Sequence, residues 1–135
     1  MKKLVLIFLT SILLFASNDM VVVTNTSVVE KLSKSEVKRL FLSKTNKVHN
    51  INIKVVELSE NGEKDKFYKQ ISGKSKSQLR SYWTRLIFTG KARPPKQVNN
   101  MQELLKEMKK SEVIVTYLPK NKVTKQMKIV YTLND

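Results

Sequence analysis

The sequence contains no cysteine and a single histidine, His49, among its 135 residues. The absence of cysteine excludes a disulfide, a thiolate metal site and a cysteine nucleophile. His49 stands in a polar stretch with no partner at the spacing of a metal ligand or an acid–base pair, so we expect an ordinary loop histidine. Nucleophile-elbow, Walker A and dinucleotide-binding glycine motifs are also missing. We therefore expect a non-enzymatic protein without catalytic residues, metal or cofactor.

Acidic residues are scarce as well, since 11 Asp and Glu oppose 26 Lys and Arg, a formal net charge of +15. A field of this sign attracts small anions, nucleic acid and anionic membrane surfaces alike, and a solvated lysine-rich surface explains it equally well. Tyr82 and Trp83 alternate with arginines, as in base-stacking surfaces, but both fall on an apolar helical stripe and are expected in the core. We therefore predict no nucleic-acid partner.

Only one long apolar run is present, Leu4–Phe15, and it is shorter than the roughly 20 residues that a membrane-spanning helix needs. Lys2 and Lys3 precede this run and the small Ala16 follows it, which is the order of a secretory signal peptide. We predict a signal peptide at 1–17, a single domain at 18–135, a periplasmic location and no integral membrane segment after cleavage. An uncleaved N-terminal anchor is the alternative.

The rest of the chain alternates apolar strands with amphipathic helices. Two capping boxes, Ser33 with Glu36 and Ser75 with Gln78, mark helix starts. The order β-α-β-α-α-α-β-β predicts an α/β domain with a mixed sheet flanked by helices. The expected strands are 20–24, 51–58, 112–118 and 127–133, and the expected helices run from the Ser33 cap to Leu42, over 63–71, from the Ser75 cap to Gly90, and over 101–110.

The helix that follows Ser75 has the clearest pattern in the chain. Its apolar residues recur at i, i+3, i+4, i+7 and i+8, which predicts a full-width stripe facing the core. These residues are Leu79, Tyr82, Trp83, Leu86 and Ile87.

Two loops are candidate anion sites because each stands between a strand and a helix. Thr26 and Ser27 follow the first strand, and Asn61, Gly62 and Lys64 follow the second. Ligands of open α/β sheets bind at the carboxyl ends of the strands, and helix N-termini attract anions. We expect the two loops to converge on a phosphate-like oxyanion.

Acidic residues cluster in the second of these loops. Glu57, Glu60, Glu63 and Asp65 surround one turn, with Lys64 and Lys66 interleaved. Neighbouring carboxylates can perform acid–base chemistry or bind calcium. The interleaved lysines and the absence of calcium-loop spacing favour a solvated turn.

Three segments of the chain resemble phosphate-binding proteins of ABC importers, and in particular their small single-lobe relatives. The resemblance implies a type II periplasmic-binding-protein-like lobe, α/β in three layers. It also implies that Arg85 and Tyr117, from late elements, join the ligand site. The segments are Leu32–Lys44 (LSKSEVKRLFLSK), Ile51–Glu57 (INIKVVE) and Gln78–Gly90 (QLRSYWTRLIFTG) followed by Pro94 and Pro95.

The chain departs from the family where the ligand would lie. Ser43 replaces the glycine of the family's F-x-G-K segment, and Asn61 and Lys64 stand near the serine and arginine that grip phosphate in full-length relatives. Lysine lacks the bidentate grip of arginine. We therefore predict weak binding of inorganic phosphate or a similar oxyanion. The alternative is a ligand-free accessory lobe that docks on an envelope partner, a permease or a sensor kinase.

Overall fold

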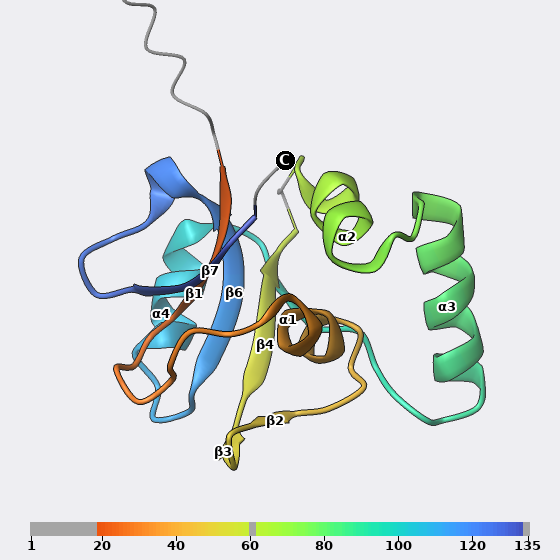
Figure 1. Cartoon of the computed structure of the whole chain (residues 1–135), viewed down its shortest axis with the longest axis horizontal. Helices are drawn as coiled ribbons and strands as arrows, with labels where there is room; N and C mark the ends of the chain where they lie inside the picture. Colours follow the sequence, from red (N-terminus) through yellow and green to blue (C-terminus); the bar gives the residue numbers. More distant parts are fainter. Residues whose placement is uncertain (1–18, 60–61, 134–135) are drawn as a thin grey trace, which may run out of the picture.

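The computed structural model describes residues 19–59 and 62–133. The predicted signal peptide and Asn61 lie outside the described residues. Four α-helices and seven strands are present in the described part of the chain (Figure 1). The helices are α1 (Lys34–Phe41), α2 (Lys64–Ser72), α3 (Lys76–Phe88) and α4 (Met101–Met108), and a short 3-10 helix, η1, covers Lys120–Lys122. The strands are β1 (Met20–Thr24), β2 (Lys47–Val48), β3 (Ile51–Asn52), β4 (Lys54–Leu58), β5 (Lys96–Val98), β6 (Ile114–Pro119) and β7 (Lys128–Thr132).

Five strands form one mixed sheet in the order β5-β4-β6-β1-β7. β4 pairs in parallel with both β5 and β6, whereas β1 runs antiparallel to β6 and β7. The remaining strands, β2 and β3, form a separate hairpin. The carboxyl ends of β4, β5 and β6 therefore meet at one edge of the sheet, and β1 ends at the opposite edge.

Helices cover both faces of the sheet, so the described chain has three layers. On one face, α1 and α2 bury an aromatic cluster in which the rings of Phe67 and Tyr117 stack at 3.8 Å. On the other face, α4 packs Leu104 against apolar strand residues. The α/β class, the mixed sheet and the three layers confirm the prediction.

Local sequence signals account for the helix starts. Ser33 accepts a hydrogen bond from the Glu36 amide while the Glu36 carboxylate accepts one from the Ser33 amide. Ser75 and Gln78 make the same reciprocal pair at the start of α3. Both predicted capping boxes are confirmed.

The predicted strand 51–58 is divided in two. His49 and Asn50 adopt left-handed backbone conformations, with φ of 48° and 65°, and form the two-residue turn of the β2–β3 hairpin. Ile53 then leaves this hairpin, and β4 joins the main sheet. The prediction also missed β5, because its Lys96–Val98 stretch carries only one buried apolar residue.

The apolar stripe of α3 is only partly buried, which corrects the expectation that all of it faces the core. Leu79 and Trp83 are buried and Tyr82 and Leu86 pack at the margin, but Ile87 is 54% exposed. α3 packs chiefly against α2 and lies beside the sheet rather than on it (Figure 1). A helix in this position buries a narrower stripe than one that lies on a sheet.

Candidate ligand-binding site at the carboxyl edge of the sheet

The carboxyl edge holds the starts of three helical segments, because β4 leads to α2, β5 to α4 and β6 to η1. A hollow of about 310 Å³ lies among them. The ends of β4 and β6 line it, together with residues from the starts of α2 and α4 and from η1. The lining residues are Leu58, Gly62, Glu63, Asn100, Met101, Pro119 and Lys122.

The two α-helices differ at the ends that face this hollow. At α4, Asn100 caps the helix by accepting a hydrogen bond from the Glu103 amide at 2.9 Å. At α2, no side-chain capping bond from the N-cap residue Glu63 is present within the described part of the chain. A helix N-terminus carries a partial positive charge and amide donors that favour an anion. The start of α2 therefore brings both amide donors and the carboxylate of Glu63 to the hollow.

Lys64 is the first residue of α2, and its side chain turns toward β4. Its Nζ lies 3.8 Å from a carboxylate oxygen of Glu57, and the side chain is 44% exposed. Lys64 does not line the hollow, whereas Gly62 does. Of the residues predicted to bind the ligand, the structure thus brings Gly62 and Lys64 together at the carboxyl edge.

Glu57 is buried, so the expectation of a wholly solvated acidic turn is wrong for this residue. It is 1% exposed, accepts a hydrogen bond from the Tyr68 hydroxyl, and accepts another from Gln97 Nε2 at 3.0 Å. Burial, and then the Glu57 charge, raise the pKa of Tyr68 well above its usual value, so Tyr68 stays protonated as the donor. The Glu57 carboxylate thus contacts Lys64 and Tyr68 in the first two turns of α2. Its negative charge repels an anion that binds at the start of this helix.

Tyr117 belongs to the core rather than to the wall of the hollow. It is fully buried in the aromatic cluster behind α2, and its hydroxyl has no hydrogen-bond partner among the described residues. Burial, followed by the charges of Glu57 and Asp65, raises the pKa of Tyr117, which keeps the phenol neutral.

Thr26 and Ser27 lie at the opposite edge, so the expectation that the two loops converge is wrong. β1 runs antiparallel to β6, and its last residue, Thr24, pairs with Val115 near the start of that strand. The Thr26 hydroxyl accepts a hydrogen bond from the Val28 amide at 3.3 Å. The loop prediction failed because β1 and β4 end at opposite edges of the sheet, and strand direction is not encoded in the loop sequences.

Arg85 lies on α3 and lines a different hollow, about 490 Å³ in volume, beside the α2–α3 turn. Neither Gly62 nor Lys64 lines this second hollow. The structure therefore distributes the predicted ligand residues over separate regions instead of one pocket.

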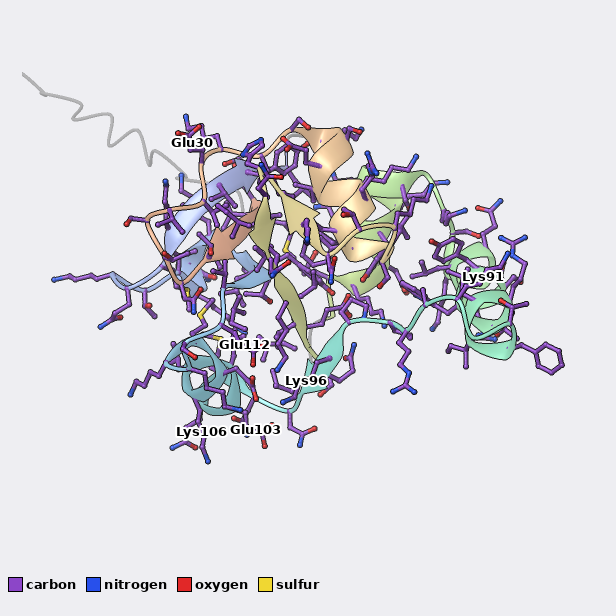
Figure 2. The ribbon with its side chains drawn as sticks, turned by 90° about the horizontal axis from the view of Figure 1, so that it is seen from below. Glu30, Lys91, Lys96, Glu103, Lys106 and Glu112 are labelled. Atoms are coloured by element: carbon purple, nitrogen blue, oxygen red, sulfur yellow. The ribbon has the colours of Figure 1, made fainter. Side chains whose placement is uncertain are left out.

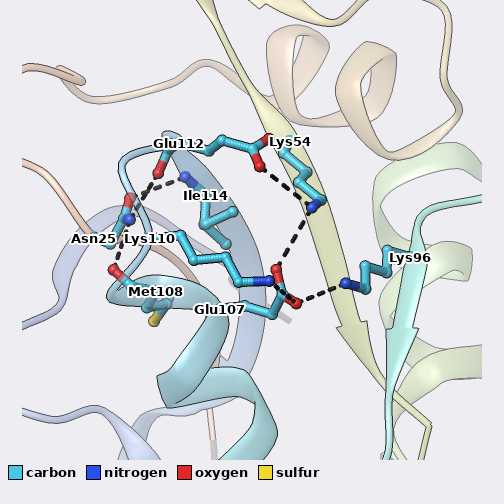
Figure 3. Close-up of polar contacts among 8 residues, drawn as sticks. All are labelled: Asn25, Lys54, Lys96, Glu107, Met108, Lys110, Glu112 and Ile114. Atoms are coloured by element: carbon cyan, nitrogen blue, oxygen red, sulfur yellow. Dashed lines mark hydrogen bonds and ion pairs between the residues drawn. The ribbon is translucent and has the colours of Figure 1, made fainter.

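A polar cluster that was not predicted lies at the amino edge of the sheet, the side at which β4 and β5 begin. Glu107 of α4 accepts hydrogen bonds from Lys96 at 2.6 Å and Lys110 at 3.0 Å, and Lys54 lies 3.5 Å away (Figure 3). The hydrogen bonds of Lys96 and Lys110 lower the pKa of Glu107 to about 2. These contacts join α4 to β4 and β5, and sequence periodicity cannot reveal them because the lysines come from separate elements.

No group of three or more His, Cys, Asp or Glu side chains lies in a metal-binding arrangement among residues 19–59 and 62–133. His49 Nε2 pairs with a Glu36 carboxylate oxygen at 2.9 Å on the surface. None of the described helices combines the length and the apolar character needed to cross a membrane.

The geometry defines a three-layer α/β domain with a mixed sheet, and a comparison with solved structures finds a similar fold. The chain is similar to an ABC-type phosphate transport receptor from Vibrio cholerae, with a TM-score of 0.58 and 13% sequence identity. The match covers 83% of this chain and 45% of that receptor, so the chain spans less than half of the length of its structural neighbour. No protein-family model matches the chain, and no curated protein matches its sequence. The likeness is therefore one of fold.

Proposed function

We propose that this protein is an exported, periplasmic binding module that holds phosphate or a related oxyanion weakly at the carboxyl edge of its sheet. The observation that carries this proposal is the hollow in which Gly62, the N-terminus of α2 and Lys122 meet. Amide donors and ammonium groups are the partners that an oxyanion requires. The fold of a phosphate transport receptor supports the same ligand class.

Lys64 supplies the second cation of the proposed site. Its ammonium lies at 3.8 Å from Glu57, beyond hydrogen-bond distance, and the side chain is 44% exposed. An anion at the start of α2 can therefore attract this side chain without breaking a close contact. We also assign Asn61, between the described residues Ser59 and Gly62, to the site on its place in the sequence.

Two features make the proposed binding weak. Glu57 and Glu63 bring two carboxylates to the region where the anion would lie, and like charges repel. The chain also covers only 45% of the receptor that it resembles, so a second lobe that could close over the ligand is not part of the match. Binding without such closure leaves the anion hydrated and limits the affinity. We expect a dissociation constant no tighter than micromolar.

Calorimetric titration tests the proposal. Phosphate and sulfate, added at low ionic strength, should release heat and raise the midpoint of thermal unfolding. Lys122→Gln should reduce the phosphate affinity, whereas Lys109→Gln, an equal loss of charge at the end of α4, should leave it unchanged. An absence of heat and of any thermal shift with both anions would refute the proposal.

One observation favours a second candidate function, that of an accessory lobe which docks on an envelope permease or sensor kinase and binds no ligand. The Glu57 carboxylate already accepts the hydrogen bonds of Tyr68 and Gln97 at the base of the α2 N-terminus. Because Glu57 occupies these two hydrogen-bond donors, they are not free to bind an external anion. Recovery of a membrane protein with this chain from the envelope fraction, together with silent phosphate titrations, would favour this second function.

A further inference from the structure

A long segment of the chain carries charge of one sign only. Residues 66–102 contain no Asp or Glu, although the whole chain has 11 acidic residues. The segment includes most of α2, all of α3 and β5. Its cations are Lys66, Lys69, Lys74, Lys76, Arg80, Arg85, Lys91, Arg93 and Lys96.

Two exposed apolar side chains lie at the end of α3 within this segment. Phe88 is 91% exposed and Ile87 is 54% exposed. The helix ends at once after them, because Gly90 takes a left-handed φ of 68° and the Lys91 amide returns to the Leu86 carbonyl at 3.0 Å. This turn holds Phe88 at the tip of the helix, with cationic residues on both sides of it in the sequence.

A basic groove continues from this tip. It has a volume of about 450 Å³ and contains no acidic residue in its lining, whereas Lys44, Lys91 and Arg93 all contribute to it. The Ser43 hydroxyl donates to the Arg93 carbonyl at 2.7 Å and fastens the groove to the end of α1. Figure 2 shows Lys91 beside α3 at one end of the molecule, with the labelled acidic residues Glu30, Glu103 and Glu112 away from it.

We propose that the end of α3 and the adjoining groove dock on an anionic phospholipid bilayer. Phe88 and Ile87 enter the boundary between headgroups and acyl chains, while Arg85, Lys91 and Arg93 contact lipid phosphates. Transfer of the exposed Phe88 ring from water into the membrane interface lowers the free energy. Each basic residue near an anionic membrane strengthens the electrostatic attraction between protein and bilayer.

The combination of groups favours a bilayer over other polyanions. A protruding apolar pair gains little from the charged backbone of nucleic acid, which is contacted mainly by polar and basic side chains. An acidic protein surface would satisfy the cations but would need a matching apolar pocket for Phe88. A bilayer deforms around the tip and supplies both environments at once.

Vesicle co-sedimentation tests this inference with the chain from Asn18 onward, which retains every described helix and strand. Residues 1–17 are omitted because the apolar run Leu4–Phe15 would itself bind lipid. The protein should bind vesicles that contain phosphatidylglycerol and should not bind pure phosphatidylcholine vesicles. Phe88→Ser should weaken binding about tenfold. Val28→Ser, at an apolar residue 59% exposed outside the segment, should leave binding unchanged.

A matched pair of triple variants separates a defined surface from net charge. Arg85→Gln/Lys91→Gln/Arg93→Gln should weaken binding about a hundredfold, at about fivefold per residue. Lys31→Gln/Lys109→Gln/Lys125→Gln has the same net charge and should bind much more tightly than that variant.

Equal losses in the two triple variants, or unchanged binding of Phe88→Ser, would overturn the proposal. Binding to polyglutamate or duplex DNA without binding to phosphatidylglycerol vesicles would also overturn it. Circular dichroism of each variant verifies the fold.

Discussion

Glu57 and Glu107 are two buried carboxylates at opposite edges of one sheet, and their surroundings differ. Glu107 lies within 3.5 Å of three lysines, with the shortest contact at 2.6 Å. Glu57 accepts hydrogen bonds from the neutral groups of Tyr68 and Gln97, and the ammonium of Lys64 is 3.8 Å away. At the amino edge, three cations surround the carboxylate. At the carboxyl edge, neutral groups donate hydrogen bonds to the Glu57 carboxylate, and the Lys64 ammonium lies beyond hydrogen-bond distance.

This difference separates a structural cluster from a candidate binding site. The lysines around Glu107 join α4 to β4 and β5, so their charge is engaged within the fold. At the carboxyl edge, the Lys64 ammonium is 3.8 Å from its carboxylate and the exposed Lys122 lines a hollow, so the Lys64 charge is paired less closely than those of Lys96 and Lys110 at Glu107. Whether a group of lysines can bind an external anion therefore depends less on their number than on the contacts that they already make within the fold.

The largest expected effect in this comparison is the loss of the Glu57 side chain. Glu57→Ala leaves the Tyr68 hydroxyl and the Gln97 amide without this acceptor and opens a cavity, which should lower the free energy of unfolding by about 3 kcal/mol. Glu57→Gln keeps an acceptor and should cost about 1 kcal/mol. Urea denaturation measures both values. Glu30→Ala, on the exposed surface, is the control, and a loss in Glu57→Ala no greater than in this control would contradict the account.

The second effect is a pH dependence that arises at Glu107. Its pKa in the folded protein is about 2, against an ordinary value of 4.5. A carboxyl group with a lowered folded-state pKa stabilises the protein above pH 4.5, and this contribution disappears as the pH falls toward 2. The unfolding midpoint of the native protein should therefore fall more steeply over this range than that of Glu107→Gln.

Glu36, whose pKa is lowered chiefly by its hydrogen bond with the Ser33 amide, contributes a similar acid dependence. It is present in both proteins, so the difference between the two curves isolates Glu107. Parallel curves for the native protein and Glu107→Gln would show that the lysine cluster adds no stability.

The smallest expected change in stability is that of Lys64→Gln. The Lys64 side chain is 44% exposed and its ammonium is 3.8 Å from Glu57, so the free energy of unfolding should change by less than about 1 kcal/mol. Phosphate affinity should nevertheless fall about tenfold, because a charge-assisted contact is lost. Calorimetry and urea denaturation on the same samples measure the two effects. A large loss of stability with unchanged affinity would assign Lys64 to the fold instead.

The sequence predicted those parts of the fold that depend on neighbouring residues. The capping boxes at Ser33 and Ser75 are local patterns, and both helices start where these patterns indicate. β5 was missed because Lys96–Val98 offers no alternation of apolar residues to detect. Ile87 was expected in the core because its spacing is helical, but spacing does not show how far a helix lies from the sheet.

The site was less predictable because its residues depend on strand direction and on contacts between distant elements. Gly62 and Lys64 were found because α2 follows β4 directly. Thr26 was placed at the wrong edge because the direction of β1 is a property of the whole sheet. The burial of Glu57 depends on Gln97, which is 40 residues away in the sequence, and no local pattern links the two.

Residue-resolved nuclear magnetic resonance is the sharpest test of the proposed oxyanion site at the carboxyl edge. In a phosphate titration of the chain from Asn18 onward, we expect amide shifts that saturate and that concentrate at 62–66, 100–103 and 119–122. These segments form the carboxyl edge of the sheet around the hollow. Shifts that concentrate instead near Lys44, Lys91 and Arg93, or no saturating shifts at all, would contradict an oxyanion site at this edge.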